Sequence, residues 1–147
     1  MDILSIVIIV FLVLELLNVI MLYKTPGTKR GNGLGVFKAF EKSKEDKEVF
    51  ELVTYLINWV AGTKLIFIVL LIGILITGSD ETKVFSVIAL IFSILTFFTR
   101  LYPSIKKMDG EGQITPAGYS KTLGMMIISF IVVFFIAVII FLYNCLK

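Results

Sequence analysis

The chain has 147 residues, of which 58% are hydrophobic and only 17% charged, with a formal net charge of +3 and a mean hydropathy of +0.99. Soluble domains carry about one quarter charged residues, so this composition excludes an ordinary soluble protein and predicts an integral membrane protein. One cysteine, Cys145, and no histidine exclude an intramolecular disulfide, the usual zinc sites and the Ser-His-Asp and Cys-His catalytic arrangements. We therefore expect no metal, no cofactor and no catalytic residue, and an enzyme is disfavoured.

Four apolar segments are each long enough to cross a hydrocarbon core, which takes roughly 20 helical residues. They cover residues 3–23, 55–77, 82–102 and 122–146, and they are separated by polar stretches at 24–50 and 103–121 and by a short polar turn after residue 77. Little chain remains outside them. We therefore predict one all-α transmembrane domain, an antiparallel four-helix bundle.

The first segment carries two polar side chains at positions where lipid would be expected. Glu15 and Asn18 lie one turn apart and therefore share a face of a helix. The segment should end before "KTPGTKRGNGLG", because Pro26 cannot continue a helix. The glycines and basic residues of that stretch predict a flexible loop.

A short amphipathic helix is predicted between the first loop and the second segment, over residues 36–47. Val36, Phe37 and Phe40 share one face there, and lysine and acidic residues occupy the other. Such a helix is typical of the membrane interface, and the pattern continues into the second apolar segment.

The second segment contains Asn58 and Lys64. Lys64 lies seven residues from the expected cytoplasmic edge at Ile57, or roughly 10 Å, and Glu15 lies eight residues from Tyr23, or roughly 12 Å. Consecutive antiparallel helices usually pack together, so the two charges should meet at matched depth as an ion pair. The alternative is a lysine stem that extends to the inner headgroups, which leaves Glu15 without a partner.

The third segment carries a stripe of small and hydroxylated residues, Ser86, Ala89, Ser93 and Thr96, at spacings of three and four. Small residues let helices approach closely in lipid, so the stripe predicts a packing seam. The alternative is a polar path shared with Glu15, Asn18 and Lys64. Arg100, followed by Lys106 and Lys107, is expected to bind phosphate headgroups.

Lysine and arginine are concentrated in the two long polar stretches, which predicts that both are cytoplasmic and both termini outside. The basic residues on the predicted inner side are Lys24, Lys29, Arg30, Lys38, Lys42, Lys44, Lys47, Arg100, Lys106, Lys107 and Lys121, against Lys83 and Lys147 on the outer side. The expected partner is a bilayer, in a cell membrane, with anionic headgroups on the cytoplasmic side, and not nucleic acid.

The polar residues Glu15, Asn18, Asn58 and Lys64 predict a small transporter or channel-like protein for an ion, proton or small solute. Four helices barely enclose a pathway, so transport implies a homo-oligomer or a membrane partner. The alternative is a non-catalytic assembly or regulatory subunit whose buried charges specify partner helices. A lipid-headgroup enzyme at the inner surface, using Asp109, Glu111, Lys106 and Lys107, is a distant third.

Overall fold

The computed structural model describes residues 1–30 and 33–146, which fold into helices and connecting turns. Lys147, counted above among the outer charges, lies outside the described residues, as does Gly31 of the predicted flexible loop. The long helices are α1 (Ile3–Lys24), α3 (Lys47–Thr77), α4 (Asp80–Leu95), α5 (Leu101–Gly110) and α6 (Tyr119–Cys145). The short ones are α2 (Lys38–Ser43) and the 3-10 turns η1 (Leu34–Val36) and η2 (Thr96–Phe98).

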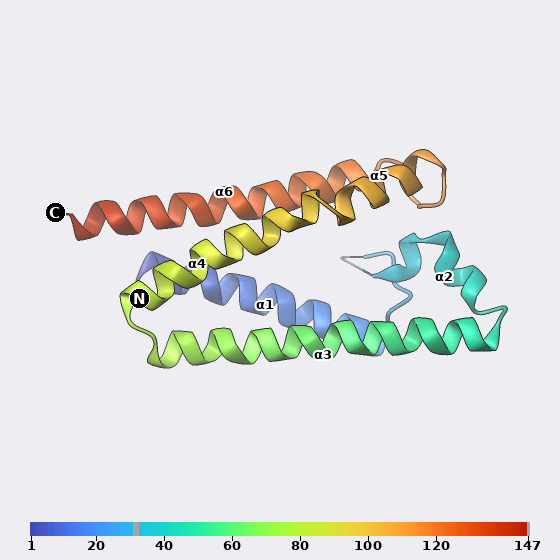
Figure 1. The fold of residues 1–147 in the computed structure, drawn as a ribbon, viewed down its shortest axis with the longest axis horizontal. Helices are drawn as coiled ribbons and strands as arrows, with labels where there is room; N and C mark the ends of the chain where they lie inside the picture. Colours follow the sequence, from blue (N-terminus) through green and yellow to red (C-terminus); the bar gives the residue numbers. More distant parts are fainter. Residues whose placement is uncertain (31–32, 147) are drawn as a thin grey trace.

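The chain runs back and forth along one axis. Both termini lie at the end that holds the turn between α3 and α4, and the α2 segment and the connection from α5 to α6 lie at the other (Figure 1). Helix α1 contacts α3, α4 and α6. It is therefore the central helix, and its side chains have the best access to the interior.

Side-chain caps explain where three of the helices begin. The Asp2 carboxylate accepts a hydrogen bond from the Ser5 amide at the start of α1, and Asp46 accepts from the amides of Glu48 and Val49 at the start of α3. Ser79 does the same for α4. Each cap satisfies amides that have no partner within the helix itself.

The third apolar segment departs from the prediction near its end. Helix α4 ends at Leu95, and after the η2 turn a new helix, α5, begins at Leu101. The sequence predicts that the third segment, residues 82–102, ends at Pro103, because proline does not continue a helix. This is wrong, since Pro103 is the third residue of α5. Proline is tolerated in a first turn, where its missing N–H has no intrahelical partner in any case.

The segment before α3 is helical over a shorter range than predicted. Helix α2 covers Lys38–Ser43, and the turn at residues 44–46 separates it from α3. Val36 and Phe40 are buried, and the Phe40 ring lies 6.2 Å from that of Phe50 in α3. The apolar face therefore packs against the protein, and its placement in the membrane interface stays a prediction.

The two long polar stretches are joined to each other by their backbones. The Lys38 amide donates to the Gln113 carbonyl at 3.0 Å, and the Thr115 amide donates to the Val36 carbonyl at 2.8 Å. Segments about 75 residues apart in the chain are therefore fixed at the same end of the molecule. The sequence predicts that the two stretches lie on the same side of the membrane, and this contact is compatible with that.

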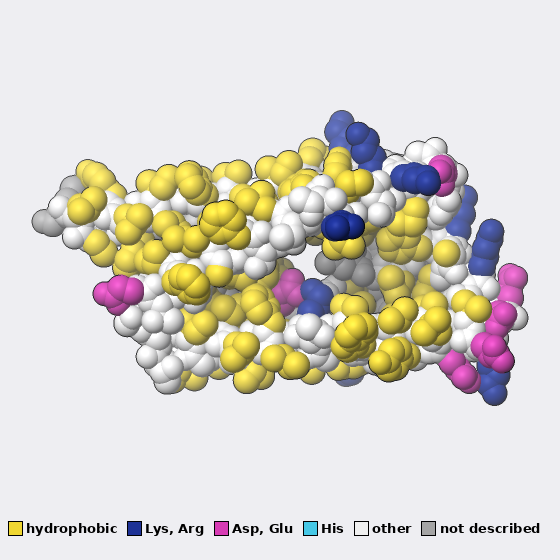
Figure 2. Space-filling view, viewed as in Figure 1, with side chains coloured by type: hydrophobic (Ala, Val, Ile, Leu, Met, Phe, Trp, Pro, Cys, Tyr) yellow, Lys and Arg dark blue, Asp and Glu magenta, His cyan; other side chains and the backbone are white. Residues whose placement is uncertain are grey.

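Apolar side chains also cover the outside of the helices. Figure 2 shows hydrophobic groups along most of the visible face and basic groups concentrated at the end that holds α2 and the connection from α5 to α6. Many large apolar residues are exposed, among them Val69, Phe92 and Phe135. Such a surface is too apolar for water and suits lipid tails.

Candidate intramembrane polar site

An ion pair joins α1 to α3 well inside their apolar stretches. The Lys64 ammonium donates a hydrogen bond to Oε2 of Glu15, and the two side chains are 28% and 21% exposed. These are the residues that the sequence analysis matched by depth. Each charge alone would cost about 2.5 to 3.5 kcal/mol at the centre of a membrane helix, and pairing lowers that cost.

Within the part of the chain that the structure describes, three cavities are lined by one or both residues of this pair. Glu15 and Asn18 line one of about 250 Å³ beside α6, and Asn18 and Lys64 line one of about 350 Å³ beside η1. Glu15 and Lys64 line the largest, of about 580 Å³, between α3 and α4. Glu15, Asn18 and Lys64 therefore each line two of the three cavities. Any two of the cavities have one of these polar residues in common.

Asn18 differs from the charged pair in its hydrogen bonding. Its Oδ1 atom is buried and has no hydrogen-bond partner. A buried carbonyl oxygen without a partner costs about 1 to 3 kcal/mol of free energy, so this acceptor is open to a donor that reaches the site.

Asn58 is not brought to the site. It is exposed, and it does not line any of the three cavities that contain Glu15, Asn18 or Lys64. Asn58 and Lys64 are six residues apart on α3, which is roughly 240° around a helix, so they point in different directions.

Aromatic side chains form much of the wall of the largest cavity. Phe11, Trp59 and Phe67 line it, and the Phe11 and Phe67 rings meet edge to face with centroids 6.1 Å apart. The hydroxyl-bearing residues Thr63 and Ser93 also line it, and the Thr63 hydroxyl donates to the Trp59 carbonyl at 3.0 Å. The cavity is thus apolar and aromatic around one charged pair.

The small-residue stripe of α4 divides into two parts. Ser86 is buried and Ala89 half-buried, which fits a packing seam, and the Ser86 hydroxyl donates to the Thr82 carbonyl at 2.7 Å. Ser93 and Thr96 are exposed. Of the four, Ser93 lines the largest cavity beside Glu15 and Lys64.

The residues expected to bind headgroups lie on or next to α5. Arg100, Lys106 and Lys107 are exposed, with Lys107 3.9 Å from Glu111. Their exposure leaves them accessible to phosphate, and headgroup binding stays a prediction.

Asp109 has a structural task that the sequence did not reveal. Its carboxylate accepts hydrogen bonds from the Gly118 amide at 3.0 Å, the Ser120 amide at 2.9 Å and the Ser120 hydroxyl at 2.6 Å. It therefore fastens the end of α5 to the start of α6. These three hydrogen bonds give the Asp109 carboxylate a structural role that requires no lipid substrate.

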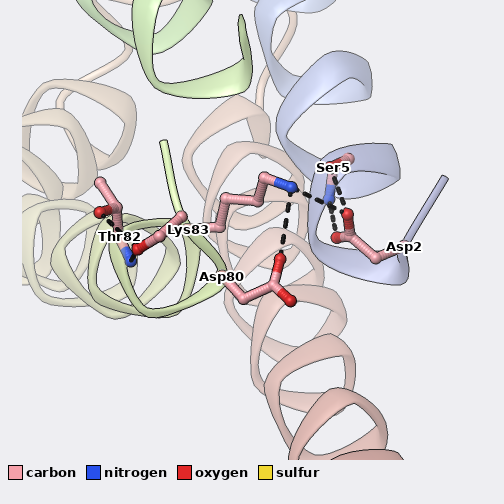
Figure 3. A network of polar contacts seen from close by, with 6 residues as sticks. Asp2, Ser5, Asp80, Thr82 and Lys83 are labelled. Atoms are coloured by element: carbon pink, nitrogen blue, oxygen red, sulfur yellow. Dashed lines mark hydrogen bonds and ion pairs between the residues drawn. The ribbon is translucent and has the colours of Figure 1, made fainter. Parts of the chain in front are cut away.

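A second ion-pair network, at the end that holds the termini, was missed by the sequence analysis (Figure 3). Lys83 of α4 reaches Asp2 at 3.1 Å and Asp80 at 3.5 Å, and Asp2 also accepts two hydrogen bonds from Ser5, each of 2.7 Å. Partial burial opposes ionisation of Asp2, but the hydrogen bonds from Ser5 and Lys83 outweigh it and hold the pKa of its carboxyl well below the usual range. The network ties the start of α1 to the start of α4.

Asp2→Asn is expected to lower the free energy of unfolding at pH 7 by about 1 kcal/mol, since asparagine still caps α1 but loses the charge. A depressed folded-state pKa stabilises the fold above the unfolded-state pKa, and this stabilisation is lost as the pH falls. The difference from wild type should therefore shrink below about pH 4. Denaturation in detergent at several pH values measures it. Asp80→Asn, on an exposed carboxylate, is the matched control and should change little.

Comparison with known protein families, with curated proteins and with solved structures found no match. Among the described residues, four helices are long and apolar enough to cross a membrane: α1, α3, the α4 to α5 stretch and α6. This places the chain in the class of small helical membrane proteins.

Proposed function

We propose that the chain is a small transporter or channel-like membrane protein for an ion, proton or small solute. The observation that carries this is the position of Glu15, Asn18 and Lys64, where three cavities meet beside the central helix. A pathway across a membrane requires polar groups that line hollow space, and the cavities lined by these three residues support the proposal.

The pair also provides a means of coupling. A carboxylate paired with an ammonium can exchange that partner, and a competing cation weakens the pairing by binding the carboxylate. The state of Glu15 therefore depends on whether a cation is present. In this scheme Glu15 receives the cargo, and Lys64 is the internal counter-charge.

The orientation belongs to the same proposal. The two long polar stretches face the cytoplasm of a cell membrane, where their basic residues meet anionic headgroups, and both termini lie outside. Because the cavities open on the helix surface, a second copy of the chain or a membrane partner is needed to enclose them.

A non-catalytic assembly or regulatory subunit is the second candidate. The observation that favours it is the exposed half of the predicted stripe, Ser93 near the end of α4 and Thr96 in the η2 turn. Capture of a stoichiometric membrane partner that is lost on Thr96→Leu would support this function.

Flux measurement in liposomes tests the proposal. Wild-type protein should move protons or a small cation, and Glu15→Gln should reduce the rate by about tenfold or more, since about 1.4 kcal/mol of lost interaction is a factor of ten. Asn58→Leu is the control for a polar residue outside the site and should leave the rate unchanged. Absence of flux of any tested solute, or equal rates in wild type and Glu15→Gln, contradicts transport through this site.

A further inference from the structure

The largest of the three cavities, between α3 and α4, has the size and the lining of a site for a small organic molecule. It measures about 580 Å³, within the range of about 300 to 1,000 Å³ that holds small organic molecules. Figure 2 shows the molecule hollowed between α3 and the α4 to α5 stretch, with an acidic and a basic side chain visible inside. The walls are aromatic, and the cavity opens at the level of the apolar helix surfaces. A ligand with an apolar body would therefore reach it from the bilayer.

The charges of the site restrict the ligand further. Among the described residues that line the three cavities, Glu15 and Lys64 are the ionisable ones. A carboxylate beside aromatic faces attracts a cation. A Mg²⁺ or Ca²⁺ ion needs about six oxygen ligands or more, which Glu15 and the hydroxyls of Thr63 and Ser93 do not supply. An organic cation carries its own apolar surface and needs only the one counter-charge.

We propose that this cavity binds a lipophilic organic monocation, with its charge at Glu15, and that Asn18 accepts the Lys64 ammonium that the ligand displaces. The proposal rests on the function proposed above, of which it names the cargo. The cation replaces Lys64 as the partner of Glu15, while its apolar body lies against Phe11, Trp59 and Phe67.

Asn18 lowers the free-energy cost of displacing the Lys64 ammonium from Glu15. A lysine ammonium that leaves its carboxylate inside the membrane needs another acceptor, because an unpaired charge there is costly. The Asn18 Oδ1 atom is buried without a partner, and Asn18 and Lys64 line the same cavity of about 350 Å³. The ammonium would leave Glu15, which does not line that cavity, for Asn18, which lines it together with Lys64.

Tetraphenylphosphonium is the probe, and Trp59 is the reporter. Trp59 is the one tryptophan of the chain and lines this cavity, and because it is also 63% exposed, only the saturable part of the quenching reports on the site. In nanodiscs of the full chain, with empty discs subtracted, we expect saturable quenching at one site. Glu15→Gln should weaken binding by about tenfold or more and Asn18→Leu by about threefold to tenfold. Asn58→Leu, on the same helix as Trp59 but outside the site, should bind as wild type does.

Tetraphenylborate has the same shape and the opposite charge, and it separates charge recognition from partition into lipid. The proposal predicts that it does not quench Trp59 at saturable sites. Preferential binding of the borate would make Lys64 the anchor and overturn the proposal, as would equal phosphonium affinity in wild type and Glu15→Gln. If Glu15→Gln does not fold, the two ions compared on the wild type decide the matter.

The two proposals can fail separately. Phosphonium binding without flux in liposomes would keep the binding site and remove the transport function. Flux of a proton or metal ion that depends on Glu15, without phosphonium binding, would keep the transport function and remove this ligand class. Wild-type affinity in Asn18→Leu, with the fold intact, would remove the role of Asn18 as the second acceptor.

Discussion

Lys64→Met alone is expected to lower the free energy of unfolding by about 2.5 to 3.5 kcal/mol, because Glu15 is then left without a counter-charge among apolar side chains. Glu15→Gln should cost a similar amount, because Lys64 is then the charge without a partner. The double variant Glu15→Gln, Lys64→Met should recover most of the loss, since neither charge remains. Titration with a denaturing detergent in mixed micelles, followed by circular dichroism, measures all four stabilities.

The control for this cycle is the exposed pair of Lys107 and Glu111, whose charged atoms are 3.9 Å apart. Its coupling should lie near zero, as for most solvent-exposed pairs. If the two single changes at Glu15 and Lys64 simply add in the double variant, the residues do not interact in the bilayer. Restored folding of the double variant without restored flux would separate the stability of the pair from its role in transport.

Phe134→Ala is expected to cost about 3 kcal/mol, at the lower end of the range for emptying a phenylalanine site. Phe134 is the largest of the fully buried side chains, 2% exposed, and its ring packs edge to face on Phe11 with centroids 5.6 Å apart. Lipid offers no hydrophobic reward for burying it, so the loss is chiefly one of packing between α1 and α6. Thermal unfolding in detergent measures the change.

The neighbouring Phe135 is the matched control, because it is the same residue type on the same helix and is 59% exposed. Phe135→Ala should change stability by less than about 0.5 kcal/mol. Equal losses at the two positions would mean that α6 does not present Phe134 to α1. A loss at Phe135 alone would mean that the helix is rotated relative to the structure.

The positions of the long helices follow from hydropathy and length, because a membrane span needs an uninterrupted apolar run. Boundaries were harder to predict. Pro103 suggested an end, yet a proline in the first turn is compatible with the start of a new helix, and nothing in the local pattern distinguishes the two. The contact between the stretches at Val36 and Thr115 depends on tertiary structure alone, so it could not be read from either stretch.

Within the candidate site, the depth of each charged residue along its helix was the signal that predicted a contact. Two opposite charges at similar distances from the same helix ends pointed to the contact of Glu15 with Lys64. Asn58 lies six residues before Lys64, so helical periodicity already places it on another face of α3. Depth alone did not predict the contact of Asp2 with Lys83 at the other end, because α1 and α4 are not consecutive in the chain.

The arrangement of three cavities around Glu15, Asn18 and Lys64 depends on how α1, α3, α4 and α6 pack, which the sequence of one chain does not specify. The sequence likewise does not specify that the Asn18 oxygen lacks a partner, since its hydrogen bonding depends on neighbours from other helices. These features carry the proposed function, and they came from the structure.

A solid-state NMR distance in lipid bilayers tests the central contact most directly. Protein carrying ¹⁵N at the lysine ammonium and ¹³C at the glutamate carboxyl should show dipolar coupling for a separation of about 4 Å that disappears in Glu15→Gln. The exposed pairs, among them Lys44 with Glu41, remain in both samples and cancel in the comparison. The account predicts a coupling difference between wild type and Glu15→Gln. Identical coupling in the two samples, with the Lys64 ammonium in contact with headgroup phosphate, would contradict it.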